Sequence, residues 1–195
     1  MKERRKSYRE RYFEDYEAIK IAANNRKGYR IEYRYIGDWM QWHSDRWSMG
    51  RVKLTLAILE MVSIAVYVAA SLSGTPLTIS RFANGFGALS LIPWLLELSG
   101  IVRFAAAKEF VKELSQKEID QSIRAGCVLR AGLLFFSALA GLVDAGVQKV
   151  LTLAYLPVTL ALLASALLSL MVWRLYNGLL ICTYSNQNGQ PSKPV

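Results

Sequence analysis

The chain has 195 residues, 53% of them hydrophobic, and carries a formal net charge of +9. The hydrophobic residues are gathered into four long blocks, a pattern that argues against one soluble domain of this length. The lysines and arginines lie mostly outside these blocks, so the basic charge is explained as a topology signal and we expect no nucleic-acid partner.

The first segment, residues 1–47, is polar and basic. Residues 3–23 show an apolar stripe at helical spacing amid charges of both signs, which predicts a helix. The stripe consists of Tyr8, Tyr12, Tyr16 and Ile19. It could lie on lipid headgroups or against the rest of the protein.

A different periodicity follows in residues 29–42. From Tyr29 onward tyrosine and isoleucine alternate with charged residues, which is typical of a strand. Gly37 and Asp38 form a two-residue turn of the kind that needs glycine at positive φ. The segment is therefore predicted to be a β-hairpin. Because an isolated hairpin is marginally stable in water, we expect it to pack on a helix, the membrane surface or another subunit.

Four stretches are long and apolar enough to cross a bilayer core about 30 Å thick, which takes roughly 20 residues of helix. They are residues 52–72, 82–104, 125–147 and 150–173. A long charged segment precedes the first of them, so none is expected to be a removable signal peptide. Ser44 is a candidate N-cap for the helix that enters the first span. Pro93 and Pro157 are expected to kink the second and fourth spans.

The connection between the second and third spans, around residues 105–124, is predicted to be a helical extension outside the membrane. An apolar stripe continues to Leu114, and Ser115 to Glu118 match a capping box that starts a new helix. By contrast, residues 185–195 are polar and contain two prolines, and we expect them to be disordered.

The basic residues also predict the orientation of the chain. Lysines and arginines are dense before the first span and in the central connection, whereas the other two turns contain Arg81 and Lys149. Positive charge stays on the cytoplasmic side, so both termini and the central connection should face inward. No Asn-x-Ser/Thr acceptor occurs in the chain, which fits a bacterial inner membrane.

Three charged residues lie inside the predicted spans. Glu60, Glu97 and Arg130 each fall roughly 7 to 12 Å below the cytoplasmic surface at 1.5 Å of rise per residue. Charged groups at that depth are costly unless they are paired, hydrated or neutral, so mutual contact is expected. They form either a structural ion pair that fixes helix register or a proton or cation site, since two carboxylates facing one arginine leave one without a full partner.

Other signs of chemistry are weak. His43 has no second histidine or cysteine at ligand spacing, and Cys127 and Cys182 are too few for a redox or metal framework. We therefore predict no metal site, no cofactor and no catalytic residues. Paired histidines, Gly-rich phosphate loops and Ser/His/acid sets are also lacking in the sequence, which argues against an enzyme.

The sequence thus predicts an all-α membrane protein, a four-helix transmembrane bundle with both termini inside and a small cytoplasmic helix plus β-hairpin. Residues 1–47 form the N-terminal segment, residues 48–184 the transmembrane domain and residues 185–195 the tail. Its expected role is that of a non-catalytic subunit or scaffold of a membrane assembly, which binds another protein or itself besides lipid. The alternative is a small transporter or channel that works as an oligomer with an intramembrane carboxylate site.

Overall fold

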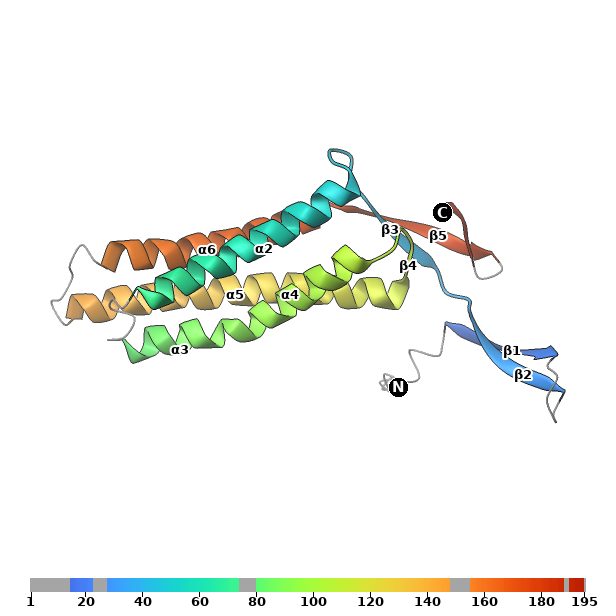
Figure 1. Cartoon of the computed structure of the whole chain (residues 1–195), viewed down its shortest axis with the longest axis horizontal. Coiled ribbons are helices and arrows are strands. Elements are labelled where there is room, and N and C mark those ends of the chain that lie inside the picture. The colour runs from blue at the N-terminus through green and yellow to red at the C-terminus, as the bar shows by residue number, and fades with distance from the viewer. Residues whose placement is uncertain (1–14, 23–27, 74–79, 148–154, 188–189, 195) are drawn as a thin grey trace, which may run out of the picture. The chain divides into compact units, whose positions relative to one another are not determined.

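The computed structural model describes residues 15–22, 28–73, 80–147, 155–187 and 190–194. These residues are mostly helical and fall into two compact units. The helical unit comprises residues 43–107 and 118–180, and the sheet unit takes residues 1–42, 108–117 and 181–195. Figure 1 labels the elements of both units.

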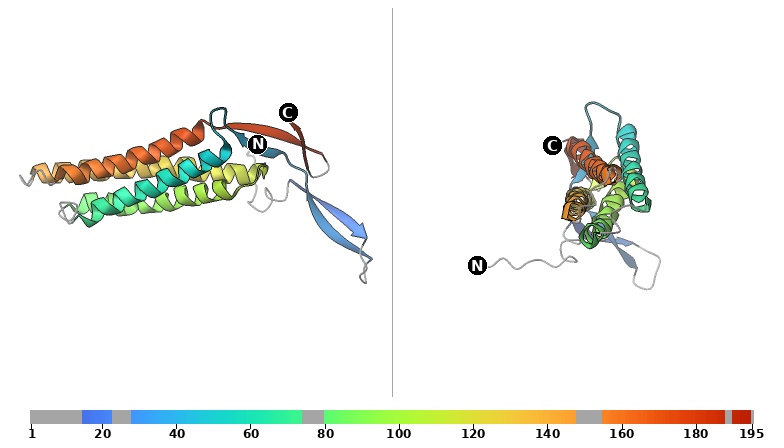
Figure 2. Two further views of the ribbon diagram at one scale, coloured as in Figure 1. Left: turned by 45° about the horizontal axis from the view of Figure 1, so that its top comes forward. Right: turned by 90° about the vertical axis from the view of Figure 1, so that its left-hand side faces the viewer.

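The helical unit contains the apolar helices that the sequence predicts. They are α2 (Met49–Leu72), α3 (Arg81–Leu89), α4 (Leu91–Ala106), α5 (Glu113–Val147) and α6 (Tyr155–Asn177). With α3 and α4 taken as one stretch, four helices of the described residues are long and apolar enough to cross a membrane. They lie side by side as a bundle (Figure 2). The four predicted apolar helices are therefore confirmed, with α3 and α4 together as the second.

Prolines and serines lie where these helices begin and break. The second span is interrupted at Ser90, the residue between α3 and α4. Pro93 has no N–H with which to bond the carbonyl four residues earlier, so the break lies where the proline predicts it. Pro157, which the sequence predicts to kink the fourth span, is instead the third residue of α6, where a missing N–H removes no intrahelical bond. The N-cap position of α2 is held by Ser48, without a capping hydrogen bond from its side chain, and not by the predicted Ser44.

The bundle has an apolar exterior and a partly polar interior. Its hydrophobic core is centred on Leu134 and Leu162, packed with alanines of α5 and α6. Serine hydroxyls also join the helices, since Ser63 and Ser165 each bond the other's backbone carbonyl. Large apolar side chains cover the outside, with Leu54 62% exposed. This inverse distribution is what a lipid environment favours.

The first element of the sheet unit is a strand where the sequence predicts a helix. Residues 16–22, predicted to be part of a helix, form strand β1 (Tyr16–Ala22), and the earlier part of that prediction lies outside the described residues. Strand β1 pairs antiparallel with β2 (Tyr29–Tyr35) over its full length, with Tyr16 opposite Tyr35. Cross-strand pairing outweighs the helical spacing because strand preference depends on the neighbouring strand more than on local sequence.

The predicted hairpin of residues 29–42 is wrong in its pairing. Both of its strands exist, but β2 pairs with β1, and β3 (Trp39–His43) pairs with β4 (Val111–Lys112). Gly37 does not adopt the positive φ expected of it; among the described glycines that conformation belongs to Gly28, at φ 68°. Glycine is needed at position 37 for space, because a Cβ there would lie 2.7 Å from the Tyr35 hydroxyl.

Segments far apart in the sequence complete a second sheet, whose strand order is β4-β3-β5-β6. Strands β5 (Leu180–Gln187) and β6 (Gln190–Pro194) pair antiparallel where a disordered tail was expected. The prolines are tolerated because β6 is an edge strand, whose outer N–H groups have no ladder partner. The helical extension predicted around residues 105–124 is confirmed in part. Residues 107–112 are not helical and include β4, whereas residues 113–124 are helical because α5 begins at Glu113, two residues before the predicted capping box.

Candidate functional site

The structure brings the three predicted charged residues together in the interior of the helical unit. Arg130 on α5 lies between Glu60 on α2 and Glu97 on α4, and all three are at most 1% exposed. One guanidinium nitrogen, Nη1, donates to Glu60 Oε1 at 3.0 Å and to Glu97 Oε2 at 3.3 Å. Three helices are thus joined through a single nitrogen atom.

Glu97 has further partners from two helices. The Ser169 hydroxyl of α6 lies 3.0 Å from Oε1 and 2.8 Å from Oε2 of Glu97, and the Cys127 thiol of α5 donates to Oε1 at 3.2 Å. Because hydrogen bonds of this kind satisfy a buried carboxylate, Glu97 is well accommodated. All four predicted spans therefore contribute a side chain to this group, named here the polar cluster: Glu60, Glu97, Cys127, Arg130 and Ser169.

Two glycines allow the close helix packing around the polar cluster. A Cβ on Gly126 would lie 2.6 Å from the backbone nitrogen and 2.8 Å from the Cα of Glu97. A Cβ on Gly100 would lie 2.6 Å from the Ile123 side chain. Helices α4 and α5 therefore meet backbone to backbone beside Glu97, as small residues permit in apolar surroundings.

The charges of the polar cluster do not balance. Two carboxylates face one guanidinium, so the group has one negative charge in excess when all three are ionised. In addition, Glu60 Oε2 and Arg130 Nη2 are buried without a hydrogen-bond partner within the described part of the chain. A buried unpartnered polar atom is destabilising, so a small polar ligand that both donates to Glu60 Oε2 and accepts from Arg130 Nη2 would stabilise the cluster.

Sequence reasoning missed three members of this environment. Ser169 is not among the residues that the sequence singled out, although its hydroxyl binds Glu97. Cys127 was expected to be an ordinary thiol, yet it lies one helical turn before Arg130 and donates to the same carboxylate. Gly126 gave no signal, because its role depends on the approach of α4. A polar residue one turn from a charge inside a predicted span is the signal that could have found Cys127. Ser169 gave no such signal, because α6 carries none of the three buried charges.

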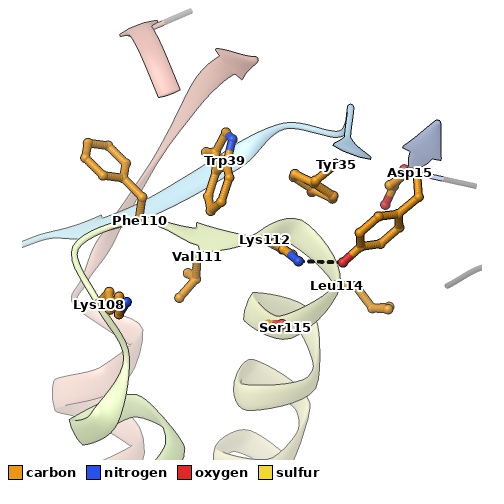
Figure 3. Close-up of a pocket in the computed structure, with 10 residues that line it drawn as sticks. Asp15, Tyr35, Trp39, Lys108, Phe110, Val111, Lys112, Leu114 and Ser115 are labelled. Carbon is orange, nitrogen blue, oxygen red and sulfur yellow. Dashed lines mark hydrogen bonds between the residues drawn. The ribbon is translucent and has the colours of Figure 1, made fainter. Parts of the chain in front are cut away.

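A second group of side chains gathers in the sheet unit, around a cavity of about 290 Å³ (Figure 3). Lys112 lies over two aromatic rings, with Nζ 4.8 Å from the ring centre of Tyr16 and 5.2 Å from that of Tyr35. It also donates to the Tyr16 hydroxyl. Trp39 packs edge-on against Tyr35. This aromatic box resembles a cation site in its chemistry, but the lysine of the chain itself fills it.

Tyr35 links this box to the start of α5. Its hydroxyl donates to the carbonyl of Asp38 at 2.8 Å and accepts from the backbone N–H of Glu113 at 3.3 Å. Burial raises the pKa of Tyr35 to about 12, and the negative charge of Asp15 acts in the same direction. The neutral phenol is therefore the form that the folded sheet unit holds.

The remaining sequence candidates stay apart from the polar cluster. His43 Nε2 lies 3.4 Å from Asp45 Oδ1 at an exposed position. Cys182 is a free, partly exposed thiol. Among the described residues no three His, Cys, Asp or Glu side chains are placed to hold a metal ion together.

Comparison of the chain with protein-family models, with curated proteins and with solved structures gives no match.

Proposed function

We propose that this chain is a multi-pass protein of the plasma membrane, of the bacterial inner-membrane type, and serves as a non-catalytic subunit or scaffold of a membrane assembly. The four apolar helices and their exposed aliphatic exterior support membrane insertion. The closed packing around the polar cluster supports a structural role for its ion pairs, which hold the helices in register.

The sheet unit supports one orientation. Strand β3 precedes α2, β4 lies between α4 and α5, and β5 follows α6, yet the three strands belong to one sheet. Hydrogen-bonded strands cannot form across a bilayer, so these segments share one side. The abundance of lysine and arginine in the same segments favours the cytoplasmic side.

This orientation can be tested by cysteine labelling in intact cells. Cysteines introduced at Thr75 and Gln148 should react with an impermeant maleimide, whereas one at Ser115 should react only after the membrane is opened. Labelling of Ser115 alone in intact cells contradicts the orientation.

The observation that carries the subunit role is the exposed and largely apolar side of the β1–β2 ribbon, on which Lys20 of β1 lies opposite Ile31. Tyr33 is 61% exposed and Ile31 is 52% exposed. Along β2 they alternate with charged residues, a pattern in which the apolar side of a strand is usually buried. Two-stranded ribbons are marginally stable alone, and exposed edges commonly bind a further strand. A partner chain, or a second copy, would bury this face.

The test places a photo-crosslinking residue at Ile31 or, as a matched control, at Glu32 on the opposite side of the same strand. Crosslinking from position 31 to one protein, with little from position 32, is the expected result. The change Ile31→Lys should then release that protein during purification in mild detergent. Equal crosslinking from both positions, or none from either, contradicts docking through this face.

One observation favours a second function, proton-coupled transport. With all three groups ionised, the polar cluster has one negative charge in excess, so uptake and release of a proton by one carboxylate would change its charge between −1 and 0. Glu60 is the better candidate, because Glu97 already accepts hydrogen bonds from Ser169 and Cys127, whereas one oxygen of Glu60 has none within the described residues.

Proteoliposomes distinguish the two functions. Glu60→Gln leaves Arg130 paired with Glu97, so the variant should fold while any proton flux falls to the level of empty vesicles. Glu17→Gln, which removes an exposed carboxylate of β1, serves as the control and should leave flux unchanged. A wild-type protein with no more flux than empty vesicles excludes the transport function and leaves the subunit role.

A further inference from the structure

A second cavity, of about 490 Å³, lies in the helical unit between the segment before α2 and the last turns of α6. Residues 44–47 line it together with Val52 and Thr55 from the first turns of α2. The other lining residues are Met171, Arg174 and Leu175 of α6, and Gly178 and Leu179 after the helix. Neither the polar cluster nor the β1–β2 ribbon contributes to it.

Two arginines give this cavity an unbalanced positive charge. Arg46 and Arg174 both line it, and within the described residues neither guanidinium group has a hydrogen-bond or ion-pair partner. Asp45 also lines the cavity, so the lining carries two guanidinium groups against one carboxylate. Guanidinium groups present a planar fork of donors that matches the oxygens of a phosphate. The cavity thus offers more positive charge than the chain itself uses.

The other walls of the cavity are apolar. Val52 is buried, Leu175 is half-buried, and Met171 is 50% exposed at the edge of the cavity. Along α6 the apolar surface continues from Met171 through Leu167, which is 62% exposed. Trp47 lines the same cavity and is 46% exposed, as is typical of an indole at a membrane interface. Cationic groups at one end and an apolar track leading away from them suit a ligand with an anionic head and a hydrocarbon chain.

We propose that this cavity binds an anionic glycerophospholipid. Its phosphate lies against Arg46 and Arg174, and an acyl chain follows Met171 and Leu175 along the outside of α6. Basic cavities between membrane helices on the cytoplasmic side are suited to such headgroups, because anionic lipids are concentrated in that leaflet. The site depends on the membrane placement proposed above, and it is independent of whether the β1–β2 ribbon binds a partner.

Native mass spectrometry of the purified full-length chain in detergent tests the site, with phosphatidylglycerol and phosphatidylcholine of the same acyl chains as probes. The wild type should retain one phosphatidylglycerol in preference to phosphatidylcholine. The double change Arg46→Gln with Arg174→Gln should lower the affinity by about tenfold or more, since each arginine supplies charge-assisted hydrogen bonds. Arg51→Gln, which removes an equal charge outside the cavity, is the matched control and should bind like the wild type.

Several outcomes contradict the lipid site. Equal retention of the two lipids, or equal binding by the wild type and the double variant, shows that the arginines do not recognise a headgroup. Inorganic phosphate binding as tightly as phosphatidylglycerol indicates a free anion instead, and a lipid-free dimer whose interface includes Trp47 indicates a second copy. Gel filtration checks that the variants fold, and each single arginine variant replaces the double one if it does not. Carbonate extraction tests membrane placement separately, so loss of binding in a chain that stays in the membrane pellet counts against this site alone.

Discussion

Gly126 directly precedes Cys127 of the polar cluster, and replacing it by alanine should disturb that cluster. The added Cβ would meet the backbone of Glu97 at 2.6 to 2.8 Å, and that backbone cannot rotate away as the end of a flexible side chain can. The contact must lengthen to the ordinary 3.4 Å, so α4 and α5 must separate. The bond from Arg130 to Glu97, already 3.3 Å long, is then lost or weakened.

The size of the effect follows from two opposing terms. Overpacking a close contact costs about 1 to 3 kcal/mol. Alanine in a helix interior recovers roughly 0.5 to 1 kcal/mol relative to glycine. The net loss should be about 0 to 2.5 kcal/mol, with a middle value of about 1 kcal/mol. Each kcal/mol lowers the Tm by about 2 to 4 °C for a chain of this size.

Gly132 on the same helix provides the control, because a Cβ there meets nothing within 4 Å. Thermal unfolding of the purified protein in detergent should show a lower Tm for Gly126→Ala and an equal or higher one for Gly132→Ala. Equal behaviour of the two variants would refute the close approach of α4 and α5 at the polar cluster.

Three further changes test other contacts. Arg130→Met leaves two buried carboxylates without their shared cation and should destabilise the protein by about 3 to 5 kcal/mol in detergent unfolding; adding Glu60→Gln should recover much of the loss, and no recovery counts against the ion pair. Burial raises the pKa of Tyr35 from 10.0 to about 12, so its stabilising effect is complete below pH 10 and is lost as the pH rises from 10 to 12. Tyr35→Phe should remove that alkaline step from a hydrogen-exchange titration of the sheet unit, and an unchanged step contradicts the assignment. Gly37→Ala should lower the Tm because its Cβ would lie 2.7 Å from the Tyr35 hydroxyl, whereas Gly50→Ala, which meets nothing within 4 Å, should not.

The sequence by itself determined the features that depend on composition over long stretches. Four helices follow from runs of about twenty apolar residues, because such a run favours helix wherever the backbone has no water to bond. The break near Pro93 follows from a missing N–H, which is a local property. The meeting of Glu60, Glu97 and Arg130 could be predicted from depth alone, since a helix rises by a constant amount per residue and buried charges seek partners.

Only the tertiary structure decided which strands pair. Residues 16–22 have helical spacing and form a strand because β2 lies beside them, and β3 pairs with β4, which comes some seventy residues later. Residues 190–194 are polar and contain prolines, yet they form an edge strand because β5 supplies the ladder. Strand preference reflects contacts with neighbours that are distant in sequence, so local periodicity cannot predict it.

The finer geometry of the polar cluster was likewise decided by packing. Ser169 and Cys127 are unremarkable residues of apolar helices until α5 and α6 bring them to the Glu97 carboxylate. Gly126 matters because the backbone of another helix occupies the place of its side chain. Depth along a helix can be counted from the sequence, but the direction in which a residue faces, and how near the next helix comes, depend on the packing of all the helices at once.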